Sequence, residues 1–138
     1  MKKNILSILT VIIGCAALLT QCASSSSSGS YSGPTYTEAQ ALHQRIFYNM
    51  SGIVEKLENV KDRTSADVAA AHLFAQGPQM ARDKRLADSP EMRPLIRQII
   101  MTSDMSERFS RLQVRFEKAE RRIKAHNYYG SSNLRRQL

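Results

Sequence analysis

Apolar residues recur at intervals of three and four from residue 39 onward, which places them on one face of an α-helix. The first such run is Ala39, Leu42, Ile46, Met50, Ile53, Leu57 and Val60. It predicts a helix over residues 37–61, with Thr37 and Gln40 as a capping box at its start. Gly52 costs about 1 kcal/mol relative to alanine inside a helix, so its presence indicates the close approach of another helix.

A second helix is predicted over residues 65–87. Thr64 and Asp67 resemble a capping box at its beginning. Alanines crowd its first half, which favours close packing against a neighbour. Pro78 follows Gly77, lacks a backbone N–H and collides with the preceding turn, so the sequence predicts a kink or a break near it.

The third predicted helix covers residues 90–127, with Ser89 as its N-cap. Its stripe is Leu95, Ile99, Met105, Phe109, Leu112, Phe116, Ala119, Ile123 and His126. At 1.5 Å per residue it would reach about 55 Å, against about 35 Å for the first helix. Either the shorter helices pack along different parts of it, or it bends at residues 102–104.

Gly130 suits the end of this helix, and Leu134 and Leu138 in the tail are expected to dock on the bundle as one short turn. Neither an alternating strand pattern nor a fixed repeat occurs in the sequence. The expected fold is therefore all-α: a small bundle of about three helices that forms one domain over residues 37–138.

The N-terminal segment has a different pattern. Two lysines precede a short apolar run, the composition of a secretory signal. The run ends in Leu19, Thr20, Gln21 and Cys22, which resembles the lipobox of bacterial lipoprotein precursors. The resemblance implies a signal peptide over residues 1–21 and a lipid on Cys22, the first residue of the mature chain.

Alternatives to this assignment exist within the same segment. Cys15 follows Gly14 and is a second candidate for the acylated cysteine. An uncleaved N-terminal anchor or a disulfide between the two cysteines would also account for the segment, and each of these places the protein outside the cytoplasm.

Residues 22–36 are rich in Ser, Gly and Pro, cannot bury apolar surface, and are expected to form a disordered tether of roughly 20 Å reach. The lipid would anchor the chain to a membrane. Ala23 and Ser24 lack the aspartate that retains many lipoproteins on the inner membrane, so a periplasmic location on the outer membrane is favoured.

Charge is unevenly distributed along the mature chain. Residues 22–88 hold seven basic and seven acidic side chains, whereas residues 89–138 hold eleven basic and five acidic. A basic ridge follows the third helix at three-four spacing, formed by Arg108, Arg111, Arg115, Lys118 and Arg122. It is either a surface for an anionic envelope component or an acidic protein, or a helix seam that pairs with Glu55, Glu58 and Asp62.

Catalytic and metal-binding patterns are not found in the sequence. His43, His72 and His126 stand in separate segments, and no phosphate loop, nucleophile elbow or Cys/His cluster occurs. We therefore expect no enzyme activity, no metal, no cofactor and no small-molecule substrate. Nucleic acid fits the charge but not the exported location.

Two functions remain. The first is a membrane-tethered structural or interaction module that presents its basic helix to a partner. The second is a holdase, because size and composition are similar to those of small exported helical chaperones of the envelope, although their L-T-x-x-Q motif is absent. A holdase would bind unfolded chains in an apolar groove that includes Met105 or Phe109.

Overall fold

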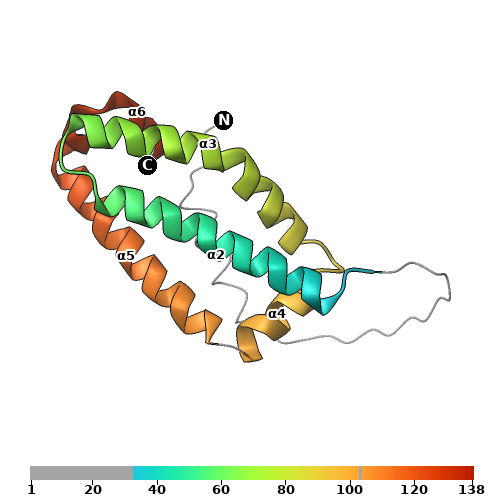
Figure 1. The fold of residues 1–138 in the computed structure, drawn as a ribbon. Helices are drawn as coiled ribbons and strands as arrows, with labels where there is room; N and C mark the ends of the chain where they lie inside the picture. The colour runs from blue at the N-terminus through green and yellow to red at the C-terminus, as the bar shows by residue number, and fades with distance from the viewer. Residues whose placement is uncertain (1–32, 103) are drawn as a thin grey trace.

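The structure is a computed structural model that describes residues 33–102 and 104–138. Within these residues it contains helices and no strand, so the all-α prediction is confirmed (Figure 1). The elements are α2 (Tyr36–Glu58), α3 (Arg63–Ala87), α4 (Arg93–Thr102), α5 (Met105–Ala125), the 3-10 helix η2 (Asn127–Gly130) and α6 (Ser132–Gln137). Cys15, Cys22 and the predicted signal segment lie outside the described residues, as does the tether before residue 33.

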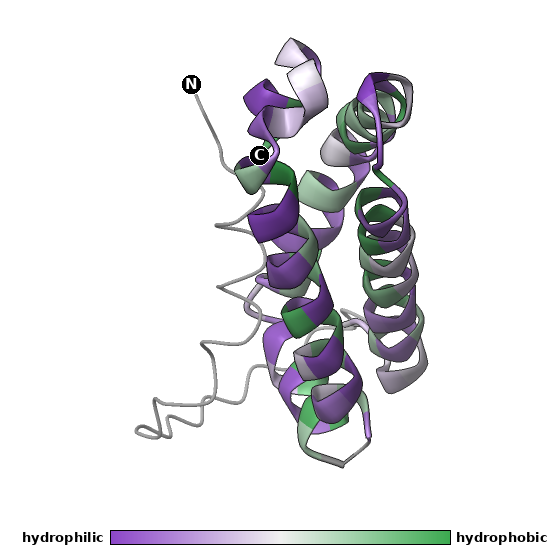
Figure 2. Cartoon of the chain, turned by 90° about the vertical axis from the view of Figure 1, so that its left-hand side faces the viewer, coloured by the Kyte–Doolittle hydropathy of each residue, from purple (hydrophilic) through white to green (hydrophobic). Residues whose placement is uncertain are grey.

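Helix α2 is the centre of the domain. It lies between α3 and α5 and also contacts α4, while η2 and α6 join α3 to α5 at the end where α2 finishes (Figure 1). Hydrophobic and hydrophilic stretches alternate along the helices, as in amphipathic helices (Figure 2). The apolar side of α2 is buried from Ala39 to Leu57. None of the described helices is long and apolar enough to cross a bilayer.

Both long N-terminal helices begin earlier than predicted. The capping box of α2 is Thr35 with Glu38, in which the Thr35 N–H donates to Glu38 Oε2 (2.6 Å) and the Glu38 N–H to Thr35 Oγ1 (3.2 Å). The predicted pair two residues later is wrong because Glu38 supplies an anion, which the positive helix N-terminus favours over the neutral Gln40. Likewise, α3 is capped by Asp62 with Ser65.

The predicted third helix is two helices. It divides between α4 and α5, at the position where a bend was one of the two alternatives, and α4 begins at Arg93 rather than at residue 90. Ser89 still caps the preceding turn, since its hydroxyl accepts from the Met92 N–H (3.3 Å). Because of this division, both α4 and α5 pack against α2. A straight helix about 55 Å long would extend past the end of α2.

The α2–α3 contact combines close approach with a buried ion pair. A Cβ on Gly52 would lie 3.7 Å from His72 Nε2, so the glycine marks a helix crossing as the sequence indicates. Asp83 is buried and accepts from Arg45 Nη2 (2.8 Å) and from Gln79 Nε2 (2.8 Å). Helix α3 continues through Pro78 without a break, and its axis bends along its length (Figure 1).

The C-terminal segment turns sharply before it docks. Helix α5 ends at Ala125, and Asn127, Tyr128 and Tyr129 follow with positive φ of 51°, 55° and 51°, ahead of Gly130 at 76°. Helix α6 then packs against α3, with Leu134 fully buried and the Ser131 hydroxyl donating to Asp67. The predicted docking of the tail as a short turn is confirmed.

Candidate functional site

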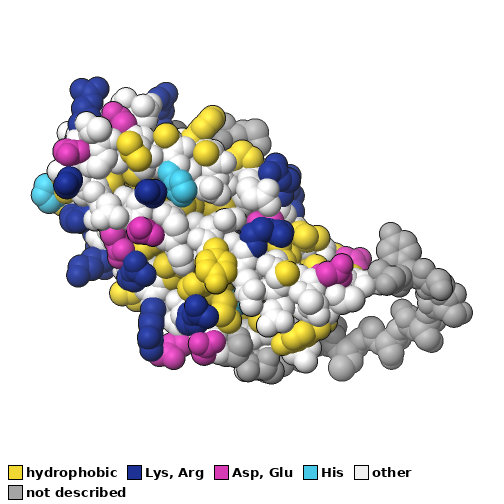
Figure 3. Space-filling model, viewed as in Figure 1, with side chains coloured by type: hydrophobic (Ala, Val, Ile, Leu, Met, Phe, Trp, Pro, Cys, Tyr) yellow, Lys and Arg dark blue, Asp and Glu magenta, His cyan; other side chains and the backbone are white. Residues whose placement is uncertain are grey.

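The predicted basic ridge lies on α5. Lys and Arg side chains follow this helix and are interspersed with Asp and Glu (Figure 3). Residues seven apart in a helix are nearly two full turns apart and share one side. Arg108, Arg115 and Arg122 therefore form an inner row beside α2, whereas Arg111 and Lys118 form an outer row further from it.

Arg115 closes the seam between α5 and α2. Its Nε donates to Glu58 Oε1 (2.9 Å) and its Nη2 to Glu58 Oε2 (2.6 Å), a bidentate pair. Hydrogen bonds from Arg115 lower the pKa of the Glu58 carboxyl, and the same bonds raise the pKa of Arg115. Of the three acidic partners considered for the ridge, Glu58 is the one that forms this pair.

The other two arginines of the inner row also contact α2. Arg122 Nη2 donates to the carbonyl oxygens of Leu57 (3.0 Å) and Glu58 (2.8 Å), which stand without helical partners at the end of α2. The Arg108 guanidinium lies 4.8 Å from the centroid of the Phe47 ring, within cation–π range. The inner row therefore serves the packing of the bundle.

The outer row makes no such contact. Arg111 pairs with Glu107 one turn earlier on α5, and both side chains are largely exposed. Lys118 attracts Glu58 electrostatically, but it forms no hydrogen bond or ion pair among the described residues. Asp62 caps α3 and is not a partner of the ridge. Arg111 and Lys118 are thus the ridge cations whose charge is directed to solvent.

The helical pattern missed further cations at the end of α5 and beyond it. Residues 121–138 contain Arg121, Arg122, Lys124, Arg135 and Arg136 and no Asp or Glu. Only Arg122 of these belongs to the predicted ridge, because Arg121 and Lys124 fall outside its three-four spacing on α5 and Arg135 and Arg136 follow the end of this helix. The reversal at η2 brings Arg135 back to this end of α5, where it donates to Asn127 Oδ1. The sequence signal that could have revealed these cations is the absence of any acidic residue among the basic residues of 121–138.

The three histidines lie apart. His43 is 2% exposed, its ring centroid lies 5.0 Å from that of Phe109, and neither ring nitrogen has a hydrogen-bond partner among the described residues. Burial lowers the pKa of His43. His72 lies over Gly52, and His126 stacks on Tyr129. Within the described residues, no group of three His, Cys, Asp or Glu could hold a metal.

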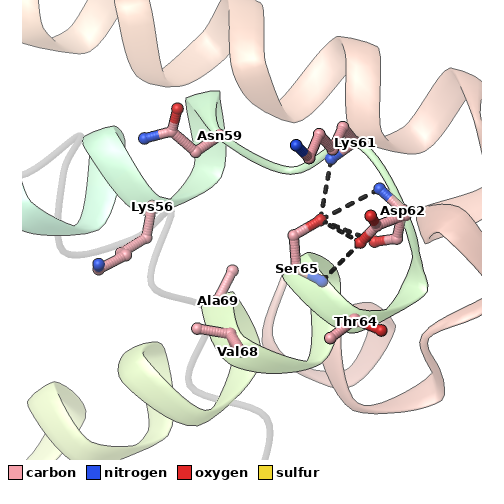
Figure 4. Close-up of a pocket in the computed structure, with 8 residues that line it drawn as sticks. All are labelled: Lys56, Asn59, Lys61, Asp62, Thr64, Ser65, Val68 and Ala69. Carbon is pink, nitrogen blue, oxygen red and sulfur yellow. Dashed lines mark hydrogen bonds between the residues drawn. The ribbon is translucent and has the colours of Figure 1, made fainter.

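A hollow of about 360 Å³ lies at the turn between α2 and α3 (Figure 4). It is lined by Lys56, Asn59, Lys61, Asp62, Thr64, Ser65, Val68 and Ala69. Asp62 and Ser65 bond to each other, as the Ser65 N–H donates to Asp62 Oδ1 (2.8 Å), and Lys56 points away from them (Figure 4). Two of the polar side chains of the hollow, Asp62 and Ser65, are thus engaged in capping α3.

Comparisons of this chain with protein families, with curated proteins and with solved structures give no match. Function is therefore inferred from the residues and the geometry of this chain alone. The clearest functional feature is that some cations on and beyond α5 bond within the bundle, whereas others are exposed to solvent.

Proposed function

We propose that the protein is a lipid-anchored protein of the bacterial cell envelope with a non-catalytic helical domain. The domain would bind an anionic envelope component or an acidic protein through the outer row, Arg111 and Lys118. The anchor would be a lipid on Cys22, with Cys15 as the alternative, and the domain would face the periplasm from the outer membrane. The signal-like apolar run, the lipobox-like Leu19 to Cys22 and the serine-rich tether support this location.

The division of the ridge into two rows carries the binding part of the proposal. Three arginines of α5 bond to α2 and have a packing role. Arg111 and Lys118 form no hydrogen bond or ion pair across that seam among the described residues, and both are exposed beside it. Exposed cations with solvent on one side and fixed cations behind them attract an anionic partner over roughly one Debye length, about 8 Å at physiological salt.

The anchor is tested by metabolic labelling. The precursor is expressed in a bacterium with radiolabelled palmitate, and Cys22→Ser is compared with Cys15→Ser. We expect only the Cys22 change to abolish labelling. Loss of label with Cys15→Ser alone would move the anchor to Cys15, and loss with neither would refute lipidation.

The outer row is tested by binding of the full chain, solubilised in non-ionic detergent, to envelope fractions. Arg111→Gln with Lys118→Gln should weaken retention, and retention of the parent should fall steeply as salt rises. Arg82→Gln with Arg85→Gln on α3 removes the same charge elsewhere and is the matched control. Equal retention of the parent and both double variants at low salt would show that the ridge is ordinary bundle surface.

A holdase remains the second candidate because large apolar side chains are exposed. Met105 and Phe109, expected in its groove, are buried (9% and 4% exposed) and are core residues instead. Tyr48 and Phe74 are 70% and 74% exposed and would have to bind the client. A holdase would suppress aggregation of an unrelated unfolded protein with little dependence on salt, and Tyr48→Ser with Phe74→Ser would abolish that activity.

A further inference from the structure

The end of the domain formed by residues 121–138, here called the basic cap, combines strong positive charge with few internal partners. It holds five basic residues and no acidic one. Lys124 pairs with Glu120 just outside the cap, and Arg122 donates to backbone carbonyls. Arg121 has no partner in the part of the chain that the structure describes. Most of this charge is therefore uncompensated.

The two arginines of α6 bond to neutral groups. Arg135 donates to Asn127 Oδ1 and Arg136 to Asn133 Oδ1, both of which are amide oxygens. The guanidinium carbons are held near the surface, and that of Arg135 lies 5.3 Å from the centroid of the Tyr128 ring. Neutral acceptors position a guanidinium without cancelling its charge, which leaves it ready for a carboxylate or a phosphate.

An aromatic pair stands within the same cap. The rings of His126 and Tyr129 are stacked in parallel, with centroids 5.1 Å apart and an interplanar angle of 1°. The backbone reaches this arrangement through three consecutive non-glycine residues in the left-handed region, each of which costs about 1 kcal/mol or more. The turn is thus fixed by packing around it, with the His126 ring exposed and the Tyr129 ring partly buried against the core.

The position of the cap and its lack of exposed apolar bulk define the kind of partner. The cap lies at the end of the bundle where α2 finishes, opposite the end where α2 begins (Figure 1). The 23 residues of α2 span about 35 Å. The large apolar side chains exposed in the described residues all lie before residue 121. A site of this kind suits a hydrated polyanion rather than insertion into a bilayer.

We propose that the basic cap binds an anionic glycopolymer of the envelope, with the arginine forks on its acidic groups and the aromatic rings against the sugars. The location of such a partner rests on the proposed function, but the chemistry of the site does not. Carboxylates fit the planar guanidinium fork, and the electron-rich ring faces attract the polarised C–H bonds of a sugar.

Binding of the detergent-solubilised full chain to immobilised polygalacturonate tests the proposal, with neutral dextran as the blank. We expect binding that weakens with salt, and a loss of about tenfold in affinity at low salt for Arg121→Gln with Arg136→Gln. The salt slope should become shallower by about two. Arg82→Gln with Arg85→Gln, of equal charge, should bind as the parent does.

Tyr129→Leu keeps an apolar side chain but removes the ring face, so it should weaken binding several-fold without changing the salt slope. Thermal unfolding of each variant excludes misfolding as the cause. Equal binding by the cap and control variants would overturn the proposal, as would binding to phosphatidylglycerol vesicles but not to polygalacturonate. Envelope retention that depends on Arg111 and Lys118 would in that case still support the proposed function.

Discussion

Helix α2 holds its two long neighbours by different means. The buried apolar residues of α3 are three alanines, Ala66, Ala69 and Ala70, with Leu73 and Met80, and Gly52 of α2 faces this helix. Small residues allow close approach but bury little area per residue. Its contact with α5 uses large side chains such as Phe109 and Phe116. Apolar stabilisation scales with buried area, so the α5 side gains more per residue and the α3 side depends more on polar contacts.

The polar contacts follow the same division. On the α3 side, Arg45 binds Asp83, whose side chain is buried, and Gln79 donates to the same carboxylate. On the α5 side, Arg115 binds Glu58 at the surface of the bundle, where both side chains are partly exposed. A helix seam poor in apolar area thus has its ion pair inside, and a seam rich in apolar area has it at the rim.

The largest expected effect is on the α5 side. Phe116→Ala removes a fully buried ring and should lower the free energy of unfolding by about 4 kcal/mol, since Phe-to-Ala changes in cores cost 3–5 kcal/mol. Leu73→Ala is the matched change on the α3 side and should cost less. Urea denaturation followed by circular dichroism measures both. A smaller loss for Phe116→Ala than for Leu73→Ala would reverse the comparison.

Removing one partner of each ion pair compares the polar contacts directly. Arg45→Ala leaves the buried Asp83 carboxylate with Gln79 alone and should cost about 3 kcal/mol, the low end for a broken buried pair, because Arg45 itself is half exposed. Arg115→Ala should cost at most about 1 kcal/mol, because its pair is exposed. Equal losses in urea denaturation would contradict the division between the seams.

His43 makes the α5 side sensitive to acid. Its folded-state pKa lies below the usual value near 6.5, so the unfolded chain binds more protons as pH falls through 6.5, and stability is lost below that pH. The slope is at most about 1.4 kcal/mol per pH unit. The carboxyls with lowered pKa, Glu38, Glu58 and Asp62, act in the same direction but below about pH 4.5.

His43→Leu should therefore flatten the dependence of stability on pH between about 6.5 and 5, and leave the loss below pH 4.5 in place. It should also stabilise the domain near pH 7, since two unpaired ring nitrogens leave the core. Denaturation midpoints measured at several pH values test this. An unchanged slope in the variant would assign the acid sensitivity to another group.

The smallest expected effect is on the α3 side, and it is a gain. Gly52→Ala adds a methyl group at ordinary contact distance from His72 and improves helix propensity, so it should stabilise the domain by about 0.5–1 kcal/mol. The rise in the unfolding temperature measures it. A loss of stability would mean that α3 approaches α2 too closely at this crossing for any side chain.

The helix starts show how far local sequence specifies the fold. The segment around residue 36 contains two overlapping capping patterns, and only the anionic Glu38 distinguishes the one that forms. At α3, Asp67 looked like a local cap, but it accepts from Ser131, 64 residues later in the sequence. No local pattern reveals such a contact. The division between α4 and α5 is similar, because it lies toward the beginning of α2 and no proline or glycine marks it.

Periodicity placed the five ridge residues correctly on α5, but it could not separate the two rows. The separation depends on which side of α5 faces α2, and Arg108, Arg115 and Arg122 differ from Arg111 and Lys118 only in that respect. The burial of His43 in the core was not predicted, for a related reason. Its position among apolar residues of α2 is visible in the sequence, but the missing hydrogen bonds are a property of the tertiary packing.

The docking of α6 has a consequence for the order of folding. With six residues, this helix cannot persist alone in water, so it forms only after α3 has presented its surface to it. The bond between Asp67 and Ser131 closes one of the long loops of the chain, which delays it further. Helix α6 should therefore be a separate unit of local opening, whose amide hydrogens exchange with solvent while those of α2 remain protected.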